Sequence, residues 1–237
     1  MNENILDVFL RMIKKHGFFQ SIKFGFNIIS QYIFLSKYFQ NKRFYFQNKE
    51  YSYFLNFLNG TLSNERIIEI PIITEILKKN QDKKILEIGN VISKYYNFPH
   101  TIVDKYERGD GVINEDVAEY NPDEKYDLIF SISTMEHVGF DEMPQEPEKL
   151  MRSFENLKSL LEEEGKIIIT MPLGYNKFLD ENLEKNNFGF NKQFFFKKDE
   201  NFNTWKEVDK IDFNSAKYEE KFPPHANELI LAIYEKK

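Results

Sequence analysis

The chain has 237 residues, of which 41% are hydrophobic, and this is enough for one sizeable core. It contains no cysteine, which excludes disulfides, thiolate metal sites and cysteine nucleophiles. The four histidines show no metal-binding spacing, so we predict no structural metal; they are His16, His100, His137 and His225.

The net charge of −6 is unevenly distributed along the chain. Residues 1–49 carry eight Lys or Arg against Glu3 and Asp7, a net charge of +6, which leaves −12 for residues 50–237. Nucleic acids bind to basic tracks that displace their counterions. The acidic main part of the chain therefore predicts that nucleic acid is not a partner.

Residues 1–60 form a basic segment rich in aromatic residues, which we predict to fold as a helical extension. Its longest uncharged run, residues 24–36, has 13 residues, well short of the roughly 20 apolar residues that span a bilayer. Two interpretations remain: helices packed over the main domain as a lid, or an amphipathic helix through which residues 1–49 contact an anionic membrane surface. Apolar residues occupy most faces of the segment, which favours the lid.

From residue 61 the pattern is that of an α/β domain, which we assign to residues 61–237. Residues 61–84 have a helical spacing of apolar residues, and we expect Pro71 to start a new helix or to kink this one. Short apolar runs bounded by turn residues then predict five strands, at 84–88, 101–104, 111–114, 127–133 and 166–171. Their near-continuous Ile, Val and Leu content is typical of parallel strands covered on both faces.

A helix is predicted between the last two of these strands, because four apolar residues share one face: Leu150, Phe154, Leu157 and Leu161. The alternation of strand and helix indicates right-handed crossovers within one sheet. A final apolar run at 228–234 predicts an antiparallel strand. The predicted fold class is α/β, a Rossmann-like, doubly wound, mostly parallel sheet with an antiparallel C-terminal strand and an N-terminal helical extension.

The ends of the predicted parallel strands indicate where a ligand binds. In an open α/β sheet the ligand lies beyond the carboxyl ends of the strands, at the switch point. Polar residues follow the first four strands: Glu87, Gly89 and Asn90; Asp104; Glu115 and Asp116; and 133–137. Asp104 ends the second strand, where an acid accepts hydrogen bonds from the ribose diol of NAD or of any other nucleoside cofactor. This acid alone does not discriminate among these cofactors.

The loop after the first strand, GNVISK at residues 89–94, does discriminate. A dinucleotide needs several glycines so that backbone amides close on its pyrophosphate, and this loop has one. S-adenosylmethionine has no phosphate and needs a carboxylate near its ammonium group and one close backbone approach, so the loop favours it. Only 12 residues, 89–100, connect the first two strands, and a helix between them must be short or irregular.

The chain resembles the class I S-adenosylmethionine-dependent methyltransferases in six fragments that occur in the same order: NERIIEIPI, ILEIGNVISKYY, TIVDKYE, GVINEDV, YDLIFSISTMEHVG and MPLGYN. It is similar in particular to a group of these proteins often associated with surface-glycan biosynthesis. The resemblance covers roughly residues 60–237. It implies S-adenosylmethionine as the cofactor and a small-molecule or glycan acceptor.

The resemblance also implies four groups of cofactor-binding residues. The methionine end would meet Glu87, Gly89, Asn90 and Val91, and the ribose and the adenine edge would meet Asp104, Lys105 and Tyr106. The adenine ring would meet Asp116 and Val117, and the reacting methyl would meet Ser133, Thr134 and Glu136. Most members of the family have further glycine where this chain has Asn90 and Val91. From the residues alone, structural roles stay open: Glu87 and Asp104 as caps or ion-pair partners at the sheet edge, and Asp116 as a helix cap.

Methyl transfer to a hydroxyl needs a general base. His137 is the leading candidate because it follows the fourth strand and titrates near neutrality, and Asp141 and Glu142 are the other candidates. A purely structural role of His137 in shaping the site stays open. Candidate acceptor-binding residues are Tyr175, Asn176 and Trp205, the last of which is as well explained by burial in the core.

We predict a cytoplasmic enzyme that O-methylates a sugar or a glycan-related small molecule, with peripheral membrane contact through residues 1–49 as a further hypothesis. Three alternatives are kept: a cofactor-free degenerate scaffold with a methyltransferase fold, a membrane-surface binding protein and, least favoured, an NAD-dependent oxidoreductase. The sequence predicts no particular oligomeric state.

Overall fold

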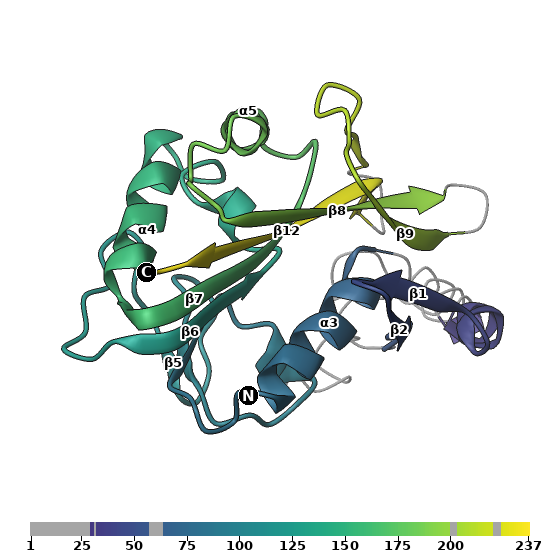
Figure 1. The fold of residues 1–237 in the computed structure, drawn as a ribbon, viewed down its shortest axis with the longest axis horizontal. Helices are drawn as coiled ribbons and strands as arrows, with labels where there is room; N and C mark the ends of the chain where they lie inside the picture. The colour runs from purple at the N-terminus through teal and green to yellow at the C-terminus, as the bar shows by residue number, and fades with distance from the viewer. Residues whose placement is uncertain (1–28, 31, 57–63, 200–202, 220–223) are drawn as a thin grey trace, which may run out of the picture.

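The computed structural model describes residues 29–30, 32–56, 64–199, 203–219 and 224–237 (Figure 1). The expectations for residues 1–28 lie outside this described part. No helix within it is long and apolar enough to cross a membrane.

Within the extension expected to be helical, residues 29–30 and 32–39 are helical, whereas residues 43–52 are not. β1 (Arg43–Phe46) and β2 (Lys49–Ser52) form an antiparallel hairpin. The two residues between them, Gln47 and Asn48, have φ of 50° and 61°, and a type I′ hairpin turn requires positive φ at both of these positions. Buried and exposed residues alternate along β1. The helical prediction is wrong for this stretch because a period of two, not of 3.6, governs its apolar side chains.

The fold class is confirmed by one large sheet, which has eight strands in the described part of the chain and the order β5-β4-β3-β6-β7-β12-β8-β9. Neighbours from β5 to β7 are parallel, and β12 is antiparallel to both β7 and β8. The strands are β3 (Ile85–Ile88), β4 (Thr101–Val103), β5 (Val112–Ile113), β6 (Tyr126–Ile132), β7 (Leu161–Pro172), β8 (Lys192–Asp199), β9 (Thr204–Val208) and β12 (Glu228–Glu235). β8 and β9 were not predicted from the sequence, because their polar flanks and lack of regular alternation give no strand signal.

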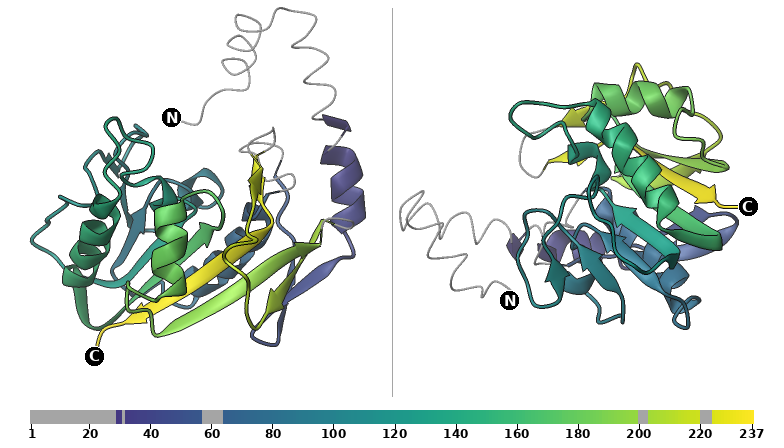
Figure 2. Two further views of the ribbon diagram at one scale, coloured as in Figure 1. Left: turned by 90° about the horizontal axis from the view of Figure 1, so that it is seen from above. Right: turned by 90° about the vertical axis from the view of Figure 1, so that its left-hand side faces the viewer.

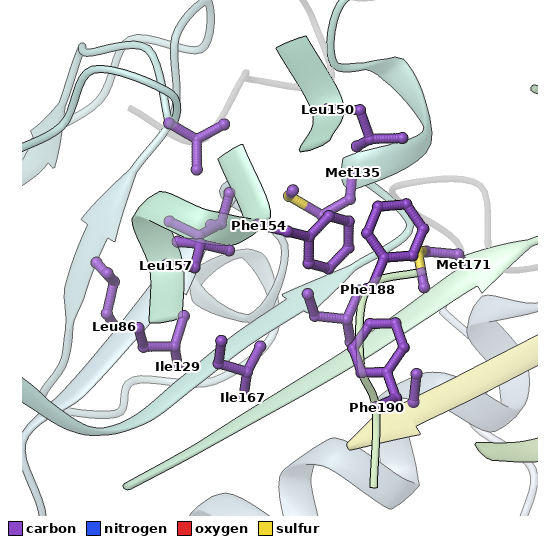
Figure 3. Close-up of a cluster of buried hydrophobic side chains, with 14 of the residues drawn as sticks. Leu86, Ile129, Met135, Leu150, Phe154, Leu157, Ile167, Met171, Phe188 and Phe190 are labelled. Atoms are coloured by element: carbon purple, nitrogen blue, oxygen red, sulfur yellow. The ribbon is translucent and has the colours of Figure 1, made fainter. Parts of the chain in front are cut away.

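Helices cover both faces of this sheet, as a doubly wound fold requires (Figures 1 and 2). On one face α4 (Glu148–Ser159) and α5 (Lys177–Glu184) build a core together with β3, β6 and β7, part of which is drawn in Figure 3. On the other face α3 (Arg66–Lys78) and the β1–β2 hairpin share a second core with the sheet. The hairpin is therefore part of the same packed unit as the sheet.

Helix α3 contains Pro71 in its interior. A proline has no N–H, so the carbonyl of Ile67, four residues earlier, loses its partner within the helix. The backbone N–H of Phe54 donates to that carbonyl instead, at 2.9 Å. Pro71 therefore neither starts nor ends a helix here; the vacated acceptor ties the chain after the hairpin to α3.

The first crossover is as short as its length predicts. The connection between β3 and β4 contains only η1 (Ile92–Lys94), a three-residue 3₁₀ helix. Strand β6 is followed by η2 (Met135–His137). A small separate sheet pairs β10 (Tyr218–Glu219) with β11 (His225–Ala226).

Candidate functional site

A cavity of about 450 Å³ lies at the carboxyl ends of the parallel strands. Thirteen of the fifteen residues proposed from the sequence line it: Gly89, Asn90, Val91, Asp104, Lys105, Tyr106, Asp116, Val117, Ser133, Thr134, His137, Asp141 and Glu142. They come from the loops after β3, β4, β5 and β6, which meet at one edge of the sheet. The other two, Glu87 and Glu136, are buried and do not line the wall.

Gly89 makes the sharp turn from β3 into the cavity loop. Its φ is +85°, a left-handed conformation that favours glycine. A Cβ at this position would collide with the side chain of Thr134, so the loop after β3 lies directly against the loop after β6. The Gly89 N–H donates to the carbonyl of Val103 at 2.8 Å and joins the loop to β4 as well.

Glu87 lies beneath this loop and holds it in shape. Its carboxylate Oε1 accepts hydrogen bonds from the backbone N–H groups of Val91 and Ile92, both at 2.8 Å. Its Oε2 lies 2.7 Å from Nε2 of His100. Because Glu87 is fully buried, its contact with any ligand in the cavity runs through the loop that it supports.

Asp104 joins the loops after β3 and β4. One carboxylate oxygen accepts from the N–H groups of Tyr106 and Glu107 at 2.9 and 2.7 Å, and the other accepts from the N–H of Asn90 at 3.1 Å. A carboxylate has about four acceptor positions, so these three bonds leave one on Asp104, which lines the cavity. Glu107, which sequence reasoning missed, also reaches the cavity and accepts from the side chain of Asn90 at 3.1 Å.

Two lysines and two acids form an ion-pair cluster on the β5 side of the cavity. Lys105 Nζ lies 2.9 Å from Asp116 and 3.0 Å from Glu142, and Lys149 Nζ is bonded to Glu142 at 2.8 Å and also to Asp116. Lys149, a buried residue of α4, was not proposed from the sequence because nothing in an amphipathic helix pattern singles out a lysine.

The cluster changes the proton affinity of its acids. Burial by itself would raise the pKa of Glu142, but hydrogen bonds from Lys149 and Lys105 outweigh it and lower the pKa. The same balance lowers the pKa of Asp116. Glu142 is therefore a weaker proton acceptor than an ordinary glutamate.

His137 and Asp141 line the cavity and form a hydrogen-bonded triad with Tyr175. Nδ1 of His137 lies 2.7 Å from Asp141 Oδ2, and the hydroxyl of Tyr175 donates to Asp141 Oδ1 at 2.7 Å. The rings of His137 and Tyr175 meet edge to face with their centroids 4.9 Å apart. Asp141 thus occupies Nδ1 of His137, and the other ring nitrogen, Nε2, lies 3.6 Å from Oε1 of Glu136.

The remaining sequence candidates have structural partners. Asn176 is buried, and its side-chain oxygen caps α5 by accepting from the Leu179 N–H at 3.2 Å. Trp205 is 2% exposed and belongs to the core on the α3 face. In the described residues no group of His, Asp and Glu is arranged to hold a metal ion.

No protein-family model matches the sequence, and no curated protein sequence matches it either. Solved structures with a similar fold include N-methyltransferase NodS from Bradyrhizobium japonicum WM9 in complex with S-adenosyl-L-homocysteine, with 11% identity, a TM-score of 0.43 and coverage of 73% of this chain and 91% of that chain. TehB from Haemophilus influenzae has 13% identity, a TM-score of 0.42 and coverage of 70% and 62%. An S-adenosylmethionine-dependent methyltransferase from Clostridium acetobutylicum ATCC 824 has 15% identity, a TM-score of 0.36 and coverage of 70% and 89%. At these values the likeness concerns the fold and assigns no activity.

Proposed function

We propose that the protein is an S-adenosylmethionine-dependent methyltransferase that O-methylates a sugar or a glycan-related small molecule. The supporting observation is the cavity wall, in which one glycine turn, Gly89, stands beside carboxylates at the ends of adjacent strands. These are the features that a cofactor with an amino-acid end and a nucleoside end needs. When bound, this cofactor supplies an electrophilic methyl group on a cationic sulfur.

The residues of the wall fit such a cofactor better than they fit NAD. A pyrophosphate binds at the N-terminus of a helix that follows the glycine loop. Here that loop leads into the three-residue η1, which has too few aligned peptides to make a comparable dipole. Apolar side chains suited to an adenine ring are present: Ile88, Val103, Val117 and Val138. Asp104 and Glu107 would hold the ribose, and Lys105 and Tyr106 would flank the adenine.

His137 is the proposed proton acceptor for an acceptor hydroxyl. Asp141 keeps Nδ1 protonated and so leaves the lone pair of Nε2 for the incoming proton. Tyr175 holds Asp141 in place, and burial together with its hydrogen bond to Asp141 raises the pKa of Tyr175, so its hydroxyl stays a donor. We expect His137→Gln to lower kcat by 10²- to 10⁴-fold, the range typical of a lost general base, without weakening cofactor binding. His225→Gln, outside the cavity, is the matched control.

Isothermal calorimetry with S-adenosylmethionine tests the cofactor assignment. We expect micromolar binding by the wild-type protein, binding roughly 10- to 100-fold weaker for Asp104→Asn because a charged acceptor is lost, and none for NAD. Asp110→Asn, an exposed residue of the same loop, is the control and keeps wild-type affinity. Absence of binding by the wild type would replace this proposal with a cofactor-free scaffold.

As a second proposal, the protein is cytoplasmic and makes a peripheral contact with the membrane. Ile33 and Phe34 are 61% and 70% exposed, and they lie within the segment of net charge +6. Exposed apolar residues among basic ones favour an anionic lipid surface. We expect the full chain to sediment with vesicles that contain phosphatidylserine and not with neutral vesicles. Ile33→Asp with Phe34→Asp should reduce that binding, and unchanged binding would argue against contact through these residues.

A further inference from the structure

Three carboxyl groups are buried beside the cavity with one guanidinium. Glu65 and Glu69 come from the start of α3 and Glu136 from η2, with exposures of 5%, 0% and 2%. Arg66, between the two α3 acids, lines the cavity. Oε2 of Glu69 and Oε2 of Glu136 have no hydrogen-bond partner among the described residues. The set therefore holds more carboxyl groups than cations in a place where isolated charge is costly.

Ser133 connects this set to the cavity. It lines the cavity wall directly after β6, and its hydroxyl donates to Oε1 of Glu69 at 2.7 Å. Its φ of 40° is unusual for a residue with a side chain, and strained backbone of this kind tends to occur at functional sites. A bond from the Ser133 N–H to the carbonyl of Thr170, at 3.0 Å, holds it in this conformation. Glu69 is thus one hydrogen bond away from any ligand that contacts Ser133.

We propose that Glu69 is a positioning residue which, through Ser133, makes the cavity prefer a cationic sulfonium over the neutral thioether that remains after methyl transfer. The inference rests on the proposed function and adds a way of distinguishing cofactor from product. The physical reason is that an ionised carboxylate near the cavity attracts a cation, and it does so more strongly in a buried place than in water.

The groups that face Glu69 make its protonation sensitive to a cation in the cavity. They are Glu65 and Arg66 on α3, Glu136 on η2, Ser133 after β6 and Thr170 on β7. Burial and then the charge of Glu65 raise the pKa of Glu69 to about 7, against the opposing effects of Thr170, Ser133 and Arg66. Burial also raises the pKa of Glu136 well above its usual range. Near neutrality Glu69 is therefore half protonated, and a nearby cation favours its ionised form and releases the proton.

Calorimetry in two buffers of different ionisation enthalpy measures how many protons the protein releases when a ligand binds. At pH 7 we expect binding of S-adenosylmethionine to release about half a proton and binding of S-adenosylhomocysteine to release almost none. Both ligands carry the same ammonium and carboxylate groups, so the difference between them isolates the sulfonium.

Two variants assign the effect to Glu69. Glu69→Gln keeps the size of the side chain and should abolish the difference in proton release and lower the ratio of the two affinities by roughly tenfold. Ser133→Ala keeps the carboxyl group and removes its link to the cavity, so it should lower the same ratio even if the first variant fails to fold. Glu75→Gln, a partly exposed residue of the same helix, is the control and should behave like the wild type.

Equal proton release for both ligands, or an unchanged affinity ratio in both variants, would overturn the role of Glu69 and leave the proposed function intact. Failure of the wild-type protein to bind either ligand would overturn the proposed function, and this inference with it. The two failures are therefore distinguishable in one set of titrations.

Discussion

Gly89 shows how closely the cavity depends on a single residue. Its left-handed φ and its approach to Thr134 are two separate demands, one on the backbone and one on the space around it. Gly111 has a similar φ of +78°, yet a Cβ there would meet nothing within 4 Å. A comparison of Gly89 with Gly111 therefore distinguishes the effect of backbone strain from that of steric collision.

We expect Gly111→Ala to lower the free energy of unfolding by about 1 kcal/mol, because only the backbone is strained. Gly89→Ala should cost about 3 kcal/mol or more, because the added methyl group also displaces Thr134. Urea denaturation followed by far-UV circular dichroism measures both values. Equal losses for the two variants would show that the loops adjust freely around residue 89.

At this scale the sequence predicted which residues gather and not what each one contacts. The strand-end rule brought Asp104, Asp116 and His137 to one cavity because the carboxyl ends of parallel strands share an edge. It did not predict Lys149, which reaches Asp116 from a helix that lies far along the chain. Such an ion pair depends on how α4 packs, and periodicity carries no information about it.

Among the elements, the β1–β2 hairpin protects the free edge of the sheet. β9 is the last strand in the order, so one side of it has no strand neighbour in the described sheet. In the hairpin turn the Gln47 N–H donates to the Glu207 side chain of β9 at 2.9 Å. Directly after the hairpin, the hydroxyl of Tyr53 accepts from the Trp205 N–H at 2.9 Å and donates to the Trp205 carbonyl at 3.3 Å. Covering an edge strand is one of the ways in which proteins hinder its pairing with other chains.

Tyr53→Phe should lower the free energy of unfolding by about 1–3 kcal/mol, because it leaves the buried Trp205 N–H without a partner. Trp205 is the only tryptophan in the sequence, so its fluorescence during urea denaturation reports on unfolding of the region that contains this contact. Tyr45→Phe is the control, since Tyr45 is exposed and its hydroxyl donates to Glu50 on the same hairpin. A loss as large in the control as in Tyr53→Phe would contradict the assignment to the edge contact.

Helix α3 supports a second prediction at this scale. Removing an interior proline normally restores a helix hydrogen bond and gains about 3 kcal/mol. In Pro71→Ala the restored N–H meets a carbonyl that Phe54 already occupies, so we expect a change of less than about 1 kcal/mol. Thermal denaturation measures it, and a gain near 3 kcal/mol would mean that the contact from Phe54 contributes little.

For the whole molecule, buried acids set the pH at which the fold is most stable. Burial raises the pKa of Glu69 from 4.5 to about 7 and that of Asp180 from 3.8 to about 6. A raised pKa means that the folded protein binds the proton more tightly. The stability that each group contributes is fully present below its pKa in the unfolded chain. It is lost as the pH rises through its higher pKa in the folded protein.

We therefore expect the free energy of unfolding to be higher at pH 5.5 than at pH 8, by about 2 kcal/mol from Glu69 and about 1 kcal/mol from Asp180. Glu69→Gln should remove the larger part of this difference and Asp180→Asn the smaller. Urea denaturation at both pH values measures it. Stability that rises with pH, or a Glu69→Gln protein with the wild-type pH dependence, would contradict the burial of an ionisable carboxyl at residue 69.

By itself the sequence determined the doubly wound sheet, the antiparallel last strand and the edge where the cavity forms. Apolar runs of strand length and their order along the chain encode all three, because parallel strands must bury both faces and turn at the same end. Only the tertiary structure decided that residues 43–52 form a hairpin against β9, that Glu87 supports the cavity loop from below, and that Glu69 lies behind Ser133. These contacts join residues distant in the chain, and their free energy depends on packing and burial that no local pattern contains.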